Sequence, residues 1–393
     1  MERNEYMNSR KIQKGFWKRL AALAVMAVVC IGLYTVSLVD RYPLMANEGR
    51  EFVKARVVEV IEDNQESGGV YIGSQTVELE LLSGAYEGEH VQAESSSAYL
   101  YGTHCTPNLK VVAIVSESNG ELVGSVYGYY REPALIGMIA LFLLTIILIS
   151  GRRGLYSVLS LAFTFLCIFW FFLPMVYRGY SPVMAAIVVV IATTLVTMYL
   201  VGGFTVKATA AVLGTVMGVL VAGLLAYVFG KIARVSGYNV SDIESLIYIQ
   251  EQLDIQVGQL MFAGILIAAL GAVMDVSMSI ASTLQELHDK NPQLDTMQLF
   301  RSGMTVGRDM MGTMSNTLIL AFTGGSINTI VLFYAYDYSR MQLINMYDIA
   351  IEIIQGVSAS MGVVLTVPFV SLIGAWMIVR TARKKSAKDG KTL

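Results

Sequence analysis

The residues of this sequence that are best suited to chemistry lie in long apolar stretches. In and just after the stretch 257–280, small and polar residues recur every three or four positions, which places them on one face of a helix. They are Gly264, Ala268, Gly271, Asp275, Ser279 and Ser282. A carboxylate inside a membrane is costly unless it meets water or a partner. Asp275 is therefore our first candidate for pairing with another group, carrying a proton or ligating a cation.

Two plainer interpretations of Asp275 remain open. It is either a structural aspartate that hydrogen-bonds a neighbouring helix, or a hydrated aspartate near the cytoplasmic end of its own helix. The small residues Gly264 and Gly271 predict close packing, because they let another helix approach this face.

A second polar stripe accompanies the apolar stretch 311–333. One helical face carries Asp309, Thr313, Asn316 and Thr323, with Gly312 beside them as a third close-packing candidate. The pair Arg308-Asp309 is expected to open this helix, since a carboxylate suits the positive end of a helix dipole. Asn316 lies deeper. The run Thr323-Gly-Gly-Ser326 predicts a break or bend near mid-depth.

A third stripe belongs to the segment that contains 357–379. Its members are Asp348, Glu352, Gln355, Ala359, Gly362 and Thr366, and Pro368 follows them. If the apolar core begins near Val357, Glu352 lies at the outer interface and needs no special role. The three stripes come from consecutive helices, so they predict one shared polar track. Its coupling candidates are Asp275, Ser279, Asn316, Asp309, Thr313, Glu352 and Gln355.

The composition indicates which elements position these residues. The chain has 393 residues, of which 55% are hydrophobic and 15% charged, and its mean hydropathy is +0.58. Soluble domains carry about 25% charged residues, so a water-soluble enzyme and a disordered chain are excluded. A pI near 6.0 gives no indication of the basic surface that binds nucleic acid. Eight apolar runs predict transmembrane helices at 17–39, 133–150, 154–175, 182–201, 208–229, 257–280, 311–333 and 357–379.

The charges predict how these helices are oriented. Basic residues gather before the first run, in alternate loops and in the tail, so both termini are expected in the cytoplasm of a multi-pass cell-membrane protein. The first run is too long for a cleaved signal peptide. We therefore predict a cytoplasmic arm (1–16), a signal-anchor helix (17–39), an extracytoplasmic β-rich domain (40–132), a seven-helix transmembrane domain (133–380) and a basic cytoplasmic tail (381–393).

The outside segment alternates apolar and polar residues as strands do. Alternation at 52–61, 75–82 and 111–115, with glycine turns between, predicts a small antiparallel barrel or sandwich of about five or six strands. It is either a passive module or a docking surface for a substrate or partner.

Two loops contain helix-start signals. Ser241 and Glu244 form a capping-box pattern that opens an amphipathic helix through about Leu253. Asn291-Pro292 predicts the start of a short helix that Gly303 ends.

Catalytic motifs are missing from the sequence. It contains no HExxH, Walker, GxSxG or paired-aspartate protease pattern. The three cysteines and three histidines are scattered, so no metal cluster is expected. We expect no enzyme activity, no catalytic residues and no cofactor.

Two long stretches resemble the YibE/F family of multipass bacterial membrane proteins. They run from Gly264 to Ser282 (GILIAALGAVMDVSMSIAS) and from Ser302 to Ala321 (SGMTVGRDMMGTMSNTLILA). The resemblance covers roughly 150–380, and an outside β-module is also typical of the family. It implies a membrane protein and names no substrate.

A fainter similarity links Asp275 and the helix that follows it to the fourth and fifth transmembrane helices of SecD/SecF-type export proteins. Those proteins belong to a proton-driven transporter superfamily. This similarity implies that Asp275 is the protonated group and that Asn316 is its neighbour in a relay. The chain departs from that unit because it has more helices and a smaller outside domain.

Three functional hypotheses follow. The first is an ion- or proton-coupled transporter with an intramembrane polar track. The second is a non-transporting partner in membrane-protein export or envelope assembly that acts through the β-rich domain. The third is a purely structural role for the polar stripes. The expected partners are the lipid bilayer, a coupling ion or proton, and either a second copy of the chain or an envelope protein.

Overall fold

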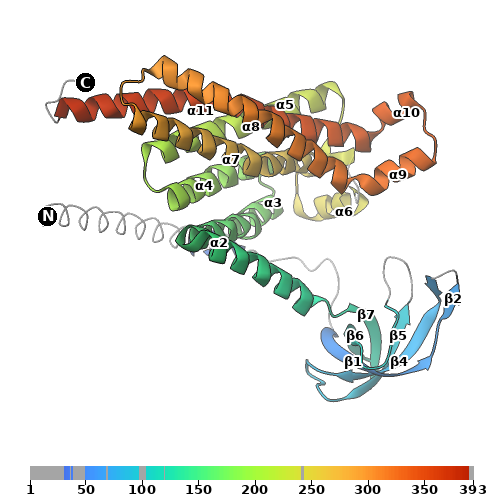
Figure 1. The fold of residues 1–393 in the computed structure, drawn as a ribbon. Coiled ribbons are helices and arrows are strands. Elements are labelled where there is room, and N and C mark those ends of the chain that lie inside the picture. Colours follow the sequence, from blue (N-terminus) through green and yellow to red (C-terminus); the bar gives the residue numbers. More distant parts are fainter. Residues whose placement is uncertain are drawn as a thin grey trace, which may run out of the picture. The chain divides into compact units, whose positions relative to one another are not determined.

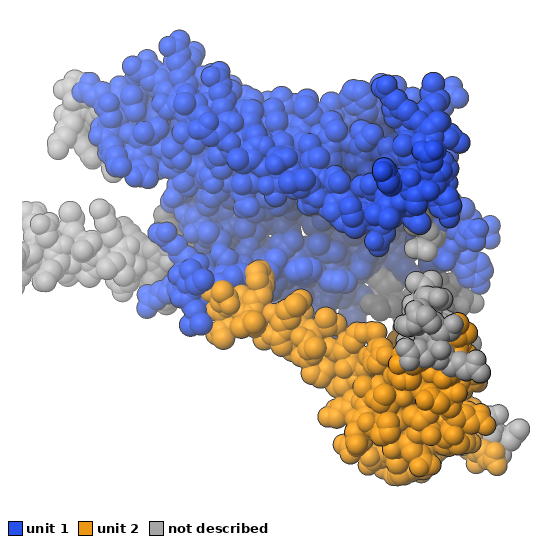
Figure 2. Space-filling model, turned by 45° about the vertical axis from the view of Figure 1, so that its right-hand side comes forward, with its two compact units in different colours: residues 1–39, 146–393 blue, residues 40–145 orange. Residues whose placement is uncertain are grey.

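The computed structural model describes residues 31–35, 37–38, 49–67, 70–96, 103–118, 120–239 and 243–388 (Figure 1). The chain divides into two compact units (Figure 2). One unit comprises residues 40–145, and the other comprises 1–39 together with 146–393. The first unit contains the strands and the second contains the packed helices.

The strands of the first unit form a closed five-stranded barrel with the order β1-β4-β5-β7-β6. Its strands are β1 (Arg50–Glu62), β4 (Ser74–Leu81), β5 (His90–Ser96), β6 (Lys110–Ser118) and β7 (Glu121–Tyr129). A hairpin of β2 (Gln65–Ser67) and β3 (Val70–Ile72) lies between β1 and β4. The β5–β7 pair is parallel and the other barrel pairs are antiparallel. This Greek-key connectivity is that of an OB-type barrel.

Alternation along the strands fills the barrel interior, as the sequence predicts. Val53, Ala55 and Val57 of β1 are buried, and their neighbours point outward. A buried amide closes one end: Gln75 Oε1 accepts a 2.6 Å hydrogen bond from the Cys105 backbone, and its Nε2 donates to Asp63 over 2.7 Å. Burial raises the pKa of the Cys105 thiol, so this cysteine is a packing residue.

A sharply bent helical segment leads along the chain from the first unit into the second. Helix α2 (Glu132–Cys167) leaves helical geometry at Gly151, where φ is 55° and ψ is −131°. A Cβ on Gly154 would touch the carbonyl of Ile146, eight residues earlier. In a straight helix such residues lie about 12 Å apart. The bend therefore lies at the predicted break between 133–150 and 154–175. A π-helical turn, η1 (Ile168–Phe172), and α3 (Leu173–Tyr177) continue the segment.

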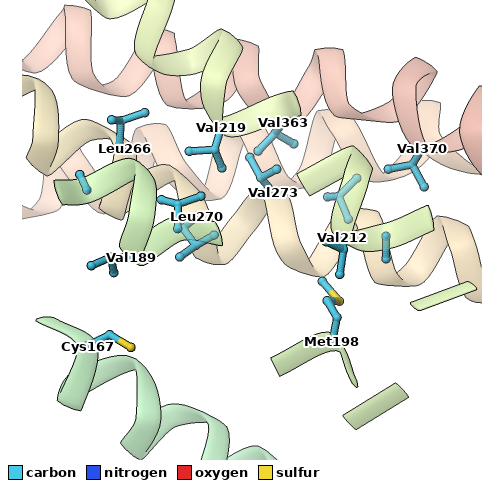
Figure 3. Packing of buried hydrophobic residues seen from close by; sticks show 14 of the residues in the cluster. Cys167, Val189, Met198, Val212, Val219, Leu266, Leu270, Val273, Val363 and Val370 are labelled. Atoms are coloured by element: carbon cyan, nitrogen blue, oxygen red, sulfur yellow. The ribbon is translucent and has the colours of Figure 1, made fainter. Parts of the chain in front are cut away.

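The remaining helices form a layered bundle in which α5, α7, α8 and α11 lie side by side and α4 packs on α5 and α7 (Figure 1). Valines fill the space between α5, α7 and α11, and Figure 3 shows Val219, Val273 and Val363 meeting there. The helices are α4 (Pro182–Gly202), α5 (Val206–Ile232), α6 (Ile243–Leu253), α7 (Leu260–Lys290), α8 (Thr296–Gly325), α9 (Ile327–Ala335), α10 (Arg340–Asn345) and α11 (Tyr347–Lys388). Short 3-10 turns, η2 (Gly237–Asn239) and η3 (Val257–Gln259), precede α6 and α7 respectively.

Among the described residues, five helical segments are long and apolar enough to cross a membrane, and the bent pair α8–α9 adds a sixth. The five are Glu132–Tyr177, Pro182–Gly202, Val206–Ile232, Val257–Lys290 and Tyr347–Lys384. Most of the predicted span 17–39 lies outside the described residues. Within it, Leu33 is buried, and Tyr34 packs edge-to-face on Trp170 of η1. The count of eight helices remains a prediction.

Two local predictions agree with the structure. The run Thr323–Ser326 does break the helix, because α8 ends at Gly325 and α9 departs at 63°. Helix α6 ends at Leu253 as expected, although its predicted cap Ser241 lies outside the described residues.

The predicted helix start at Asn291-Pro292 is wrong. Asp295 caps α8 instead, in a capping box with Gln298. The helix continues through Gly303, which packs against Ser371. For the same reason Asp309 lies in the middle of α8 and does not open a helix.

The close-packing glycines are not those that the sequence predicts. Among the described residues, no heavy atom lies within 4 Å of a Cβ built on Gly264, Gly271 or Gly312. Tight positions between the helices of the bundle include Gly214, Gly218, Gly223, Gly303, Gly307 and Gly362. At Gly218 on α5, a Cβ would collide with Thr366 Oγ1 of α11 and approach Val273 of α7 to 3.0 Å. The three central helices therefore meet at Gly218.

We predict that Gly218→Ala destabilises the helical unit. The added methyl group has no space between α11 and α7, and overpacking of this kind costs about 1–3 kcal/mol in the free energy of unfolding. Gly264→Ala is the matched control, because its methyl group meets open space and alanine favours a helix over glycine by about 1 kcal/mol. Thermal unfolding of the detergent-solubilised chain measures both. An equal loss of Tm in the two variants would contradict this packing.

Candidate functional site

Helix α7 presents two different faces. Its apolar face packs into the bundle, where Val273, Ser277 and Ile280 are fully buried. The opposite face carries the stripe predicted from the sequence: Gly264, Ala268, Gly271, Asp275 and Ser279 are exposed, and Ser282 is half-buried. The predicted stripe thus lies on one surface of α7, on the side that faces α2 and α4.

Asp275 lies at a cavity of about 510 Å³ between α2, η1, α4 and α7. Hydroxyl groups line one part of this cavity: Ser157, Ser160 and Thr164 from α2 and Thr197 from α4. Ser160 Oγ donates a 2.6 Å hydrogen bond to Thr197 Oγ1, which ties α2 to α4. The rest is mainly apolar, with Leu270, Met274 and Met278 of α7 and Ile168, Val189 and Met198 among its lining residues. We call this space the Asp275 cavity.

The Asp275 carboxylate has no hydrogen bond and no ion pair to any residue that the structure describes. A carboxylate in such surroundings must be hydrated, protonated or bound to a cation, because leaving an isolated charge in an apolar space costs many kcal/mol. The predicted hydrogen bond to a neighbouring helix is therefore not formed within the described chain. The cavity offers room for water or a small ligand instead.

The hydroxyl groups of the Asp275 cavity are absent from the sequence-based candidate list. Ser157, Ser160 and Thr164 recur at three- and four-residue spacing, which is the same signal that identifies the stripe on α7. Their small polar side chains are common in apolar helices, where they usually hydrogen-bond their own backbone. Ser157 and Thr164 do so here, to Arg153 and Ser160.

Glu352 lies at a second place, where α11 passes the break between α8 and α9. Ser326, the residue at that break, donates a 2.5 Å hydrogen bond from Oγ to Glu352 Oε1. Glu352 Oε2 is buried and has no hydrogen-bond partner among the described residues. The interpretation of Glu352 as a simple interface residue is therefore insufficient. Two cavities of about 230 and 240 Å³ adjoin it, and we call them together the Glu352 site.

The remaining candidates on α8 belong neither to the Asp275 cavity nor to the Glu352 site. Asp309, Thr313 and Asn316 are exposed and line neither the Asp275 cavity nor the Glu352 site. Thr313 Oγ1 bonds back to its own helix, donating to the carbonyls of Asp309 and Met310. Gln355 is half-buried on α11 and lines neither place.

The predicted single polar track is therefore not assembled. Asp275 and Glu352 line separate cavities, and Asn316 lies outside both. The reason is the orientation of α7: its polar stripe faces α2 and α4, and its apolar face is turned toward α5, α8 and α11.

We predict that water reaches the Asp275 cavity. In a background without native cysteines, Asp275→Cys should react with a small, charged thiol reagent roughly tenfold or more faster than Ser277→Cys. Ser277 is the matched control, because it lies two residues away on the buried face. Equal labelling rates in liposome-embedded protein would contradict an aqueous cavity.

Comparison with known proteins agrees with the membrane character of these helices. A family model described as YibE/F-like protein matches residues 138–380, a range that includes the Asp275 cavity and the Glu352 site and starts after the barrel. No curated protein and no solved structure matches the chain. The similarity to SecD/SecF-type helices thus remains a prediction. The resemblance carried by residues 264–282 and 302–321 is confirmed, and the chain is a membrane protein that belongs to the YibE/F-like family.

Proposed function

We propose that this protein is an ion- or proton-coupled transporter of the cell membrane whose coupling group is Asp275. One observation carries the proposal: a carboxylate with no partner among the described residues lines a cavity of about 510 Å³ between apolar helices. Intramembrane carboxylates that face a cavity are typical of substrate pathways and proton relays. In the proposed topology both termini are cytoplasmic and residues 40–132 are outside.

The chemistry of the Asp275 cavity favours transport over catalysis. Among the residues that the structure describes, its polar groups are hydroxyls and a single carboxylate, with no nucleophile–base pair such as hydrolysis requires. The sequence has no nucleotide-binding motif, so a gradient or a partner protein would supply the energy. A carboxylate that gains and loses a proton or cation would couple that gradient to movement of the surrounding helices.

A purely structural role for Asp275 has less support. An aspartate that holds helices together needs a donor on a neighbouring helix, and no described residue provides one. The stripe glycines Gly264 and Gly271 likewise contact no described helix on their open side.

We predict that Asp275→Asn abolishes ion movement. Full-length protein in liposomes, driven by a potassium diffusion potential, should admit protons or radioactive sodium faster than protein-free vesicles. Asparagine keeps the shape of the side chain but cannot carry a proton or neutralise a cation, so flux should fall to the protein-free rate. Thermal unfolding should stay close to that of the wild type, because Asp275 has no described partner to lose.

Asp309→Asn is the control, since Asp309 is an exposed carboxylate outside the Asp275 cavity. It should leave flux unchanged. Wild-type flux in Asp275→Asn, or a large drop in its Tm with flux intact, would refute the coupling role.

A second candidate function rests on the barrel. Phe52 of β1 and Tyr127 of β7 are 52% and 63% exposed, and their rings pack edge-to-face with centroids 5.3 Å apart. Exposed aromatic pairs are typical of protein-binding hot spots. We propose, as the alternative, that the chain assists membrane-protein export or envelope assembly through this surface without transporting anything itself.

We predict that a photo-crosslinking residue at Tyr127 forms a discrete adduct with an envelope protein in living cells. The same residue at Glu94, which is exposed on β5, should form none. Under this alternative, Phe52→Ser abolishes the adduct, and ion flux in liposomes stays at the protein-free rate with or without the substitution. Absence of any adduct at Tyr127 would remove the support for this function.

A further inference from the structure

We propose that the Glu352 site, at the break between α8 and α9, binds a sodium ion. The ligands would be the carboxylate of Glu352 and the hydroxyl of Ser326, completed by water and by the neighbouring hydroxyls of the two cavities. Binding at this site goes beyond the proposed transport function, because it does not require that the chain move a substrate.

The first support is the unsatisfied oxygen of Glu352. Oε1 accepts the hydroxyl proton of Ser326, while Oε2 is shielded and without a partner among the described residues. An ionised carboxylate would need a donor or a cation at Oε2. A protonated one would still leave one oxygen without a partner. Buried polar atoms of this kind are normally explained by a water or an ion, and a cation bound to this carboxylate would supply the partner that Oε2 lacks.

The second support is the space and the oxygen atoms beside Glu352. The cavity of about 230 Å³ is lined by Ser326, Thr329 and Asp348 as well as Glu352, and the cavity of about 240 Å³ adds Thr323. Hydroxyl and carboxylate oxygens are the ligands that hard cations prefer. Asp348 is exposed one helical turn before Glu352, where its charge would attract a cation toward the site.

The third support is the uncompensated charge of the site. No Lys, Arg or His lines either cavity, and no ion pair involves Glu352 or Asp348 among the described residues. The half-helix ends at Ser326 belong to α8 and α9, so a C-terminal and an N-terminal dipole meet there and offset each other. The net charge of the site is therefore set by its carboxylates, and a cation neutralises it.

The number of carboxylates selects a monovalent ion. No group of three or more Asp, Glu, His or Cys side chains that could hold a metal occurs among the described residues. Calcium sites usually draw six to eight oxygens from several carboxylates. A single partly buried carboxylate with hydroxyls beside a broken membrane helix instead fits sodium, which discontinuous helices bind in transporters.

The test measures binding of radioactive sodium to the full-length protein in detergent, with choline chloride holding the ionic strength constant. We expect saturable binding and a rise in Tm with sodium chloride that potassium chloride does not match. Glu352→Gln should lose both effects, since glutamine can still accept the Ser326 hydrogen bond but carries no charge. Ser326→Ala, which removes one ligand, should weaken binding and keep the charge.

The controls separate this proposal from the transport function. Asp309→Asn should bind sodium as the wild type does, and Asp275→Asn should keep the sodium site that Glu352→Gln loses, even if Asp275→Asn carries no flux. The proposal is overturned if the wild type binds no sodium saturably, if calcium or potassium competes equally well, or if Glu352→Gln binds like the wild type. Should Glu352→Gln not elute as a folded protein, unchanged sodium affinity in Ser326→Ala overturns it.

Discussion

The cost of holding a carboxylate in an apolar medium is the constraint on which the rest of this structure depends. Only a few acidic side chains lie within the long helices, and each needs water, a proton, a donor or a cation. The fold answers this need differently at its two principal carboxylates. Asp275 faces a cavity large enough for water and ligand, whereas Glu352 has one oxygen bound by Ser326 and the other shielded. The open cavity suits a carboxylate at Asp275 that exchanges its proton or cation. The shielded position suits a carboxylate at Glu352 that keeps its partner bound.

Tight packing on one side of the bundle is what leaves the other side open. At Gly218, α5 lies so close to α11 and α7 that no side chain fits between them. That contact orients α7 with its apolar face inward, and its polar stripe must then face α2 and α4. The hydroxyl groups of α2 and α4 complete the cavity there. The close contact at Gly218 thus helps to fix the orientation of α7, and with it the direction of the Asp275 side chain.

Periodicity in the sequence predicted which residues share one face of a helix or strand. It did not predict which other element packs against that face. The stripe on α7, the break at Thr323–Ser326 and the alternation inside the barrel follow from spacings of a few residues, which local geometry dictates. Whether a glycine lies against another helix depends on residues far away in sequence. Gly264 and Gly218 therefore look alike in the sequence, although only Gly218 contacts α11 in the structure. The error at Asn291-Pro292 has a local cause, because Asp295 with Gln298 supplies the stronger capping box. The predicted shared track failed because the direction of α7 depends on tertiary packing.

The separation of the two carboxylates limits how they can communicate. Asp275 follows Val273 by two residues, and Val273 packs at Gly218 against the same junction as Thr366 of α11, the helix that carries Glu352. Direct proton transfer between the carboxylates is therefore not the route, since they line different cavities. A mechanical route is available, because a shift of α7 or α11 at either site would disturb the contact at Gly218. Close-packed interiors have low compressibility and transmit strain, so a shift of α11 at Thr366 would be passed through Gly218 to Val273 and α7.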